Sequence, residues 1–311
     1  MSQSSNVVDL DESAGRTAAQ LHQILSRGDR AVWAATALAL ALRDDTASDQ
    51  RRAARSVLNS IAPDLDLDSG QLDRRGLSAQ AAAPILQAAA LLTDKVETWA
   101  GQTDDAILAQ GRASAQGAKA VVQYGLPMLS GLPQAMAAPG ARMLDVGTGV
   151  AALAVAYAEL FPALTVVGID VLPRVLRLAE ETRKASTVAD RVVLRQQDVG
   201  TLDEVAVYAL AFLPAPFVPE TALRAGVSRI ARALIPGGWV LVAHGKFAGD
   251  PIDDAVTRFR TIAYGGTSLD DTQAEVLLEE AGFVDIMSAP TPPGAPAITV
   301  GRRSPVNGVS G

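Results

Sequence analysis

The sequence predicts an α/β protein in which a largely helical N-terminal half precedes a parallel sheet covered by helices on both faces. Three observations support this fold class. Apolar residues make up 49% of the 311 residues but aromatic residues only 4%, so Ala, Leu and Val dominate. Before Gly140 the apolar residues recur at helical spacing. After it, short apolar runs alternate with helical stretches, which is typical of strands joined by crossover helices.

Composition excludes several classes of site. The chain has no cysteine, so disulfides, thiolate metal sites and cysteine nucleophiles are ruled out. Two histidines, His22 and His244, are too few for a histidine-rich metal site, and we expect no metal. The net charge of −7 is spread evenly: residues 1–138 carry 12 basic and 15 acidic side chains, and the remainder 15 and 19. Without a basic excess, a nucleic-acid partner is not expected.

We expect a cytoplasmic protein with no membrane partner. No apolar run reaches the ~18 residues that span a bilayer. The first residues, "MSQSSNVVDLDES", are polar and acidic, unlike a signal peptide, and residues 1–13 are predicted to be a disordered lead.

The N-terminal half is predicted to form a helical domain over residues 14–138. Helical periodicity runs through residues 17–43, 48–62 and 78–92, and a last helical segment crosses 104–137. Ser48 is the expected N-cap of the second stretch. The acidic stretch 62–78 interrupts the pattern as a loop.

The C-terminal half, residues 139–303, is predicted to alternate strand and helix, with a flexible tail at 304–311. Pro173 stands where a helix accepts proline, in its first turn. "PGG" at 236–238 marks a turn into a buried strand. We expect strands at 142–146, 165–170, 191–195, 205–213 and 238–244, helices at 149–160, 173–185 and 219–234, then a capped helix and two short strands at 284–289 and 297–303.

The glycine turn after the first of these strands is the main functional signal. It reads Asp145-Val146-Gly147-Thr148-Gly149, and glycines in a strand-to-helix turn let backbone approach a ligand closely. With Ala152, the two glycines also fit the G-x-G-x-x-G/A fingerprint of dinucleotide-binding proteins. Asp170 ends the next strand 23 residues after Gly147, the right distance for a carboxylate that binds a ribose. The pattern alone leaves a nicotinamide cofactor and a structural turn open.

Two further acids favour a positively charged adenosyl ligand. Asp145 ends the first strand, where a carboxylate would repel a pyrophosphate and attract a sulfonium or an ammonium. Asp198 ends the third strand in "VVLRQQDV", and we expect it to accept a hydrogen bond from an adenine amino group.

At these residues the sequence resembles the class I S-adenosylmethionine (SAM)-dependent methyltransferases of the small-molecule type. "LDVGTG", "VVGID", "QQDV" and "LIPGGW" look like four motifs of that family in the right order over roughly 140–303. The resemblance implies a Rossmann-like sheet of seven strands whose last strand is antiparallel. It also implies SAM as cofactor, S-adenosylhomocysteine as product and methyl transfer to a small-molecule acceptor, oxygen ahead of nitrogen or carbon. A SAM-binding sensor or scaffold is the alternative, with an NAD(P)-dependent oxidoreductase behind it.

The resemblance assigns the cofactor contacts residue by residue. Gly147 and Gly149 would border the methionine part, Asp170 the ribose and Asp198 the adenine, with Asp145 near the amino-acid end. The family's frequent third glycine is Ala151 here. The full set of expected cofactor-binding residues is Asp145, Gly147, Thr148, Gly149, Asp170, Val171, Gln197, Asp198, Val199 and Leu213.

The acceptor site is expected over the carboxyl edge of the sheet, roofed by the helical half. His244 ends the fifth strand and is the one candidate general base, although a lone histidine there is more often structural. Leu213, Pro214 and Phe217 suggest an apolar wall. Gln110, Ser114 and Gly117 share one helix face. The other roof and lid candidates are Trp99, Arg112, Tyr124, Arg258, Arg260 and Tyr264. Trp33 and Trp99 are expected in the core more readily than at a substrate. A helical half of this kind resembles natural-product O-methyltransferases, in which it often builds a homodimer.

Overall fold

The computed structural model describes residues 4–70, 72–93, 98–291 and 295–305. The chain divides into two compact units, Met1–Ile85 and Leu86–Gly311, and the division falls inside helix α3 (Arg74–Thr93). This division differs from the domain boundary expected at residue 138. Residues 86–138 belong to the unit of the sheet because their helices pack on it.

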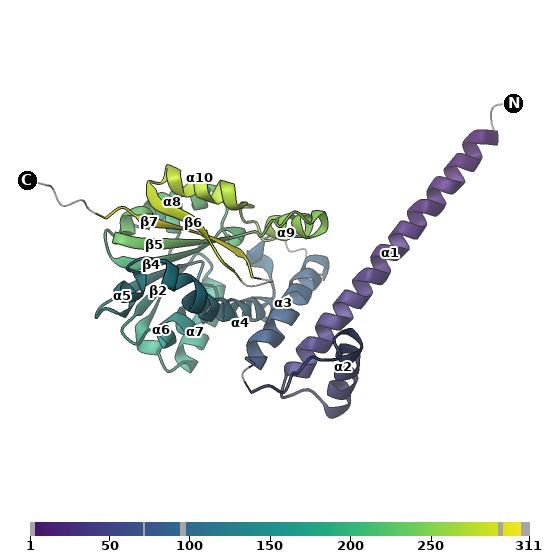
Figure 1. Ribbon diagram of the computed structural model, residues 1–311, viewed down its shortest axis with the longest axis horizontal. Coiled ribbons are helices and arrows are strands. Elements are labelled where there is room, and N and C mark those ends of the chain that lie inside the picture. The colour runs from purple at the N-terminus through teal and green to yellow at the C-terminus, as the bar shows by residue number, and fades with distance from the viewer. Residues whose placement is uncertain (1–3, 71, 94–97, 292–294, 306–311) are drawn as a thin grey trace, which may run out of the picture. The chain divides into compact units, whose positions relative to one another are not determined.

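The first unit is built from α1 (Ser4–Leu42), α2 (Ser48–Ile61) and the first part of α3 (Figure 1). Buried alanine and leucine side chains hold the C-terminal part of α1 against α2, and Leu67 joins them. Helix α1 reaches back to Ser4, whereas residues 1–13 were expected to be a disordered lead. No proline interrupts residues 4–42, so the helix continues through this polar stretch.

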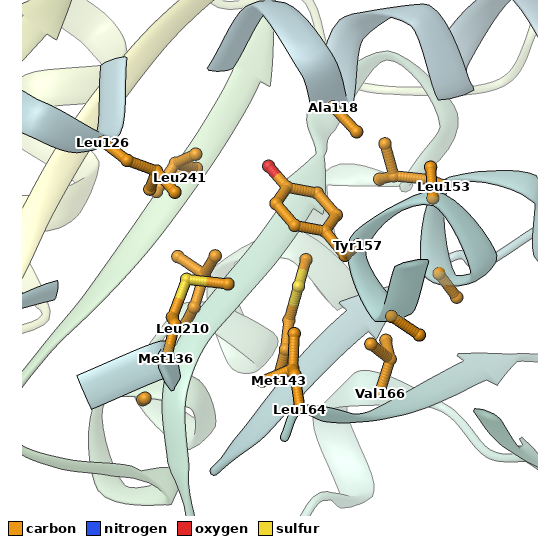
Figure 2. Close-up of a cluster of buried hydrophobic side chains, with 14 of the residues drawn as sticks. Ala118, Leu126, Met136, Met143, Leu153, Tyr157, Leu164, Val166, Leu210 and Leu241 are labelled. Atoms are coloured by element: carbon orange, nitrogen blue, oxygen red, sulfur yellow. The ribbon is translucent and has the colours of Figure 1, made fainter. Parts of the chain in front are cut away.

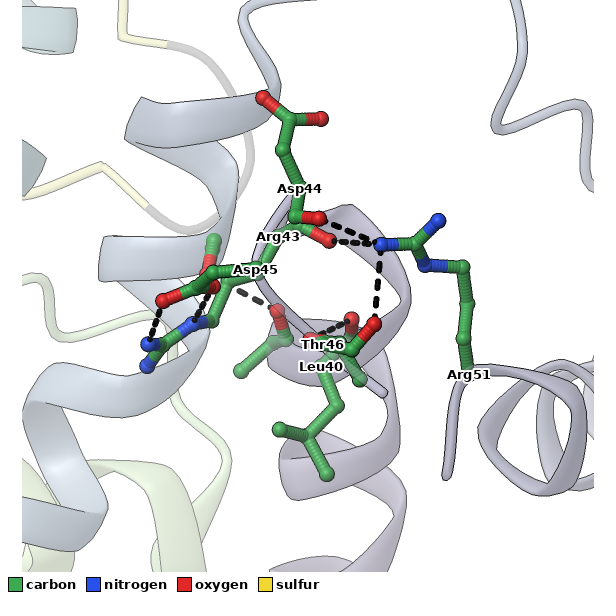
Figure 3. Close-up of polar contacts among 8 residues, drawn as sticks. Leu40, Arg43, Asp44, Asp45, Thr46 and Arg51 are labelled. Carbon is green, nitrogen blue, oxygen red and sulfur yellow. Dashed lines mark hydrogen bonds and ion pairs between the residues drawn. The ribbon is translucent and has the colours of Figure 1, made fainter. Parts of the chain in front are cut away.

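The connection between α1 and α2 is fixed by polar contacts to backbone carbonyls (Figure 3). The guanidinium of Arg51 donates to the carbonyl oxygens of Arg43, Asp44 and Thr46 at 2.8–3.1 Å. The Thr46 hydroxyl donates to the carbonyl of Leu40 at 2.8 Å. Ser48 is the first helical residue and Ala47 occupies the N-cap, so the expected cap at Ser48 is wrong. The side chains of Arg51 and Thr46 donate to the backbone carbonyls of this connection instead.

The second unit contains a seven-stranded sheet in the order β3-β2-β1-β4-β5-β7-β6. The first five strands are parallel, and β7 lies antiparallel between β5 and β6. This confirms the predicted Rossmann-like sheet with an antiparallel last strand. The strands are β1 (Arg142–Val146), β2 (Thr165–Asp170), β3 (Val192–Gln196), β4 (Tyr208–Pro214), β5 (Leu234–His244), β6 (Phe283–Ala289) and β7 (Ala297–Arg303).

Helices cover both faces of this sheet (Figure 1). Buried residues of α4 (Asp104–Ala120), α5 (Leu132–Ala137), α6 (Ala152–Leu160) and α7 (Pro173–Ala185) share one apolar cluster with one face. In Figure 2, Tyr157 of α6 lies at the centre of this cluster, between Met143, Leu153 and Leu210. The opposite face packs against α8 (Glu220–Ala233) and α10 (Asp271–Glu280).

The remaining segments of this unit are short. A 3-10 turn, η1 (Trp99–Gly101), precedes α4, and one π-helical turn, η2 (Val121–Gly125), follows it before η3 (Leu126–Met128). The 3-10 turn η4 (Ala189–Arg191) precedes β3, η5 (Val199–Thr201) follows β3 and η6 (Ala215–Phe217) follows β4. Helix α9 (Pro251–Ala263) follows β5. Residues 306–311 of the expected tail lie outside the described residues.

Helix α3 is long and apolar enough to span a membrane by length and composition, with a mean hydropathy of 1.2 over its most apolar window. This differs from the expectation that no segment qualifies. One such helix is weak evidence, because core helices pass the same test.

Candidate functional site

The glycine turn after β1 depends on left-handed backbone. Gly147 and Gly149 have φ values of +59° and +57°, and Ala151 follows at +59°. Residues with a side chain rarely adopt this backbone conformation, which explains why two of the three residues are glycine. Because the left-handed residues continue to Ala151, α6 begins at Ala152 rather than at residue 149 as expected. The turn is tied to β2 by the Thr148 N–H, which donates to the carbonyl of Ile169 at 3.0 Å.

Asp145 is buried beneath this turn, with only 1% of its surface exposed. Its Oδ2 accepts a hydrogen bond from the Thr148 hydroxyl at 2.7 Å. A Cβ atom at Gly168 would lie 2.5 Å from the Thr148 Oγ1, so glycine at this position of β2 makes room for the threonine. The glycine in "VVGID" therefore supports the site, a role that the sequence pattern did not reveal.

Burial sets the protonation of Asp145. Loss of solvent, reinforced by the nearby Asp170, raises the pKa of Asp145 from 3.8 to about 7, against the lowering effect of the Thr148 hydrogen bond. Burial, and to a lesser extent the charge of Asp145, raises the pKa of the neighbouring Tyr157. The carboxyl thus exchanges its proton near neutral pH, and a cationic ligand beside it would favour the ionised form.

A pH dependence of stability follows. The folded-state pKa of Asp145 lies above its unfolded value of 3.8, so the folded protein binds this proton more tightly. Its contribution to stability is therefore fully present below pH 3.8 and is lost as pH rises from there to about 7. We expect the thermal unfolding temperature of wild type to fall more steeply between pH 4 and 7 than that of Asp145→Asn. Identical slopes in differential scanning fluorimetry would contradict this ionisation.

Asp170 ends β2 and connects the turn to the next helix. Its Oδ2 accepts the Gly149 N–H at 3.1 Å and its Oδ1 accepts the Leu172 N–H at 2.9 Å. Burial raises the pKa of Asp170, and its backbone hydrogen bonds oppose this. Each carboxylate oxygen keeps a further lone pair, so this side chain can still accept hydrogen bonds from a ligand.

The end of β3 supplies the third acid. Asp198 is exposed, and its Oδ1 accepts the Gly200 N–H at 2.7 Å as the cap of η5. The N–H of the neighbouring Gln197 donates to the carbonyl of Asp170 at 3.0 Å, which holds the ends of β2 and β3 together.

One cavity of about 340 Å³ collects these residues at the carboxyl edge of the parallel strands. Of the ten expected cofactor-binding residues, nine line it: Asp145, Gly147, Thr148, Gly149, Asp170, Val171, Gln197, Asp198 and Val199. Leu213 does not, because alternation along β4 turns it into the core next to α8, fully buried. Its neighbours Phe212 and Pro214 line the cavity instead.

Three aromatic rings form another wall of the cavity. Phe217 stacks on Tyr264 with ring centroids 5.0 Å apart, and Trp99 meets the two rings edge-on at 4.7 and 5.4 Å. Trp99, which the sequence pattern placed in the core more readily than at a substrate, lines the cavity with the other two. The Trp99 N–H donates to the carbonyl of Tyr264 at 3.1 Å, which joins η1 to the end of α9.

Helix α4 closes the cavity above the glycine turn. A Cβ at Gly111 would lie 2.1 Å from a methyl group of Val150, so this glycine lets the helix approach the turn. Gln110 and Ser114 line the cavity as expected, whereas Gly117 does not. Trp33 and Tyr124 are exposed by 62% and 56%, so the expected burial of Trp33 is wrong. Arg112, Arg258 and Arg260 do not line the cavity either.

His244 is not brought to the cavity. The side chain is 1% exposed, and its Nε2 lies 2.8 Å from the Thr299 Oγ1 and its Nδ1 3.0 Å from the carbonyl oxygen of Gly245. Burial lowers its pKa, which favours the neutral ring. The position at the end of β5 is as predicted, but the ring points to a hydrogen-bonded core site and not to the cavity that holds the other candidates.

The sequence pattern did not reveal Thr98, Gly265 and Gly266, which help to shape the aromatic wall. Gly266 lies so close to η6 that a Cβ would fall 1.8 Å from the Pro216 carbonyl oxygen. The two consecutive glycines after Tyr264 were the signal in the sequence for this close approach. Only the fold shows that Pro216 lies opposite Gly266. Among the described residues, no group of three or more His, Cys, Asp or Glu side chains is placed to bind a metal.

The sheet order, the glycine turn and the acidic strand ends define a class I, Rossmann-like methyltransferase fold. Residues 143–238 match the family model described as a methyltransferase domain. The ribosomal protein L11 methyltransferase of Pelotomaculum thermopropionicum is 38% identical over 112 residues, which are 34% of this chain and 33% of that protein. The match thus spans only about a third of the curated relative.

Solved structures share the fold over nearly the whole chain. Human N-acetylserotonin methyltransferase, solved in complex with SAM, is 15% identical with a TM-score of 0.58, covering 98% of this chain and 99% of that one. The mitomycin 7-O-methyltransferase MmcR is 19% identical with a TM-score of 0.57, covering 94% and 100%. Residues 143–238 therefore form a methyltransferase domain, and the likeness to these solved structures shows its fold.

Proposed function

We propose that this protein is a SAM-dependent methyltransferase that binds SAM in the cavity at the strand ends and methylates a small molecule. The observation that carries the proposal is the convergence of the glycine turn, Asp170 and Asp198 on one cavity, opposite an aromatic wall. A cofactor half and an acceptor half are both needed for group transfer, and this cavity offers both.

The residues of the cavity fit SAM. Gly147 and Gly149 carry no side chain that would fill the space near the methionine part, and Asp170 keeps lone pairs for the ribose hydroxyls. Asp198, exposed at the end of β3, can accept from the adenine amino group. Asp145 would lie near the ammonium end. A buried carboxyl there attracts a sulfonium ligand and repels a pyrophosphate, which disfavours a nicotinamide dinucleotide.

The acceptor is proposed to be a small molecule with oxygen as the methylated atom. The likeness to N-acetylserotonin methyltransferase and to mitomycin 7-O-methyltransferase supports this choice. SAM supplies an electrophilic methyl group, so the protein mainly aligns the acceptor and excludes water. Trp99, Phe217 and Tyr264 give an apolar surface on which a flat acceptor can lie.

Incubation with methyl-labelled SAM and a fractionated small-molecule extract tests the activity. We expect label in a low-molecular-weight product with wild type and none with Asp170→Ala. Label that appears only in protein or nucleic acid would refute the proposed acceptor class, and no label with proven SAM binding would refute catalysis.

A homodimer is the partner we propose, formed through α1. Leu21, Ile24, Leu25 and Val32 lie on one side of this helix and are 46–71% exposed. Sedimentation velocity should give about twice the chain mass of 32.2 kDa. Ile24→Glu should shift it towards the monomer, and His22→Glu, off that stripe, should not. A wild-type monomer at micromolar concentration would contradict the proposal.

A further inference from the structure

A chain of hydrogen bonds runs from α9 through α3 to α4 and ends at the cavity. The Arg260 Nε donates to the Tyr264 hydroxyl at 3.2 Å, and that hydroxyl donates to the Oε1 of Gln87. The Gln87 Nε2 then donates to the Oε1 of Gln110 at 2.8 Å, and the Gln110 Nε2 donates to the Ser114 Oγ at 3.2 Å. All five residues belong to the second unit.

The orientations of two glutamine amides set the direction of the bonds in this chain. A guanidinium only donates, so the Tyr264 oxygen accepts from Arg260, and the tyrosine hydrogen is left to donate to the Gln87 Oε1. Gln87 is 2% exposed and must then present its carbonyl oxygen to Tyr264 and its NH₂ group to Gln110. The same reasoning turns the NH₂ group of Gln110 towards Ser114.

The chain ends at the Ser114 hydroxyl, which still has a hydrogen to donate. The Ser114 oxygen accepts from Gln110, and within the described part of the protein no side chain is seen to accept its hydroxyl hydrogen. Both Ser114 and Gln110 line the cavity, whereas Gln87 does not. The hydroxyl hydrogen of Ser114 is therefore available to a ligand at this wall.

The charges around the cavity restrict the ligand further. Asp145, Asp170 and Asp198 line it, and among the described lining residues there is no Lys, Arg or His. A carboxylate or phosphate on the acceptor would therefore find no Lys, Arg or His among the described lining residues to pair with it.

We propose that the acceptor is an uncharged, flat molecule with a carbonyl-type oxygen that accepts the hydrogen bond of Ser114. This assignment rests on the proposed function and names the substrate class of the same site. Ser114 contacts the substrate, and Gln87 and Tyr264 are positioning residues that keep Ser114 a donor.

Two matched probes test this class: 1-tetralone and tetralin, which share the same fused rings and differ by one carbonyl oxygen. Titration uses the full chain saturated with S-adenosylhomocysteine. Without a donor the ketone should bind more weakly, because it loses its hydrogen bonds to water. We expect wild type to prefer 1-tetralone about fivefold, the effect of one hydrogen bond, and Ser114→Ala to prefer tetralin. Tetralin-1-carboxylate should bind more weakly than both.

Substitution of Gln87 probes the direction of the chain from outside the cavity. In Gln87→Glu, measured at pH 9 with the carboxylate ionised, residue 87 can only accept. Gln110 must then turn its NH₂ group towards Glu and its oxygen towards Ser114, which now donates to Gln110 and offers lone pairs to the ligand. The preference for 1-tetralone should disappear or invert. Gln87→Met, which breaks the chain without reversing it, should keep part of the preference.

The outcomes separate this inference from the proposed function. If S-adenosylhomocysteine does not bind, the proposed function fails. If it binds to all variants but wild type prefers tetralin or the carboxylate, or if Gln87→Glu and Gln87→Met behave alike, the inferred substrate class or its positioning chain is wrong. Unchanged thermal unfolding of each variant shows that the fold is kept.

Discussion

Replacement of Asp170 by alanine should weaken S-adenosylhomocysteine binding by about 100-fold. Two ribose hydroxyls that donate to a carboxylate contribute roughly 1.5 kcal/mol or more each, about 3 kcal/mol together, and every 1.4 kcal/mol is a factor of ten in affinity. The loss also frees the Gly149 N–H, which Asp170 holds at 3.1 Å, so the glycine turn loosens as well. Isothermal titration calorimetry measures both the affinity and the stoichiometry.

Two variants control this experiment. Asp170→Asn keeps the volume and one carbonyl-type acceptor oxygen, so its affinity should fall between that of wild type and that of the alanine variant. Asp190→Ala removes an acid on η4 that does not line the cavity and should leave binding unchanged. Wild-type affinity in a folded Asp170→Ala variant would show that the ribose lies elsewhere.

The second large effect concerns stability. Gly266→Ala should lower the free energy of unfolding by about 3 kcal/mol, because its Cβ would overlap the Pro216 carbonyl oxygen at 1.8 Å and neither backbone can yield cheaply. For a unit of this size the thermal midpoint should fall by roughly 6–12 °C. The strain acts on the segment that carries Tyr264 and on η6, which carries Phe217, so the stacked rings should separate.

A helical glycine is the matched control. Gly117 in α4 has open space at the position that a Cβ would take, so Gly117→Ala should hold or raise the midpoint, by at most about 1 kcal/mol of stability. Equal midpoints for Gly266→Ala and wild type in differential scanning calorimetry would mean that residue 266 is not packed against η6.

The sheet could be predicted closely because its signals are local. β1 and β2 have the predicted bounds, and α7 begins at Pro173 and ends at Ala185 as expected. The bounds shifted where backbone geometry overrides composition. Residues 149–151 read as helix from their neighbours, but left-handed backbone delays α6 to Ala152. β5 starts at Leu234, before the Pro-Gly-Gly turn, because a bulge lets Leu234 still pair with Tyr208.

The cofactor side of the cavity was predictable for the same reason. Parallel strands end at one edge, so residues 145, 170 and 198 had to meet once the strands were found. Leu213 was predicted to line the cavity, but its neighbours Phe212 and Pro214 do so instead. Which side chains of β4 face the cavity depends on where the strand begins to pair. His244 was found at the right strand end, but which way its ring points is decided by Thr299 on β7, 55 residues later.

The aromatic residues of the acceptor side were each candidates, but their grouping could not be predicted from local pattern. Trp99, Phe217 and Tyr264 come from three separate segments, and no spacing rule links them. Gln87 gave no signal because a glutamine in an alanine-rich helix reads as an exposed residue. Its burial follows only from the hydrogen bonds to Gln110 and Tyr264.

We expect the cavity at the strand ends to bind an S-adenosyl nucleoside and to reject a dinucleotide that carries a pyrophosphate. Calorimetric titration of the full chain with S-adenosylhomocysteine and, in parallel, with NADH tests it directly. We predict saturable one-to-one binding of S-adenosylhomocysteine and no measurable heat with NADH. Tight binding of NADH together with no response to S-adenosylhomocysteine would contradict the account.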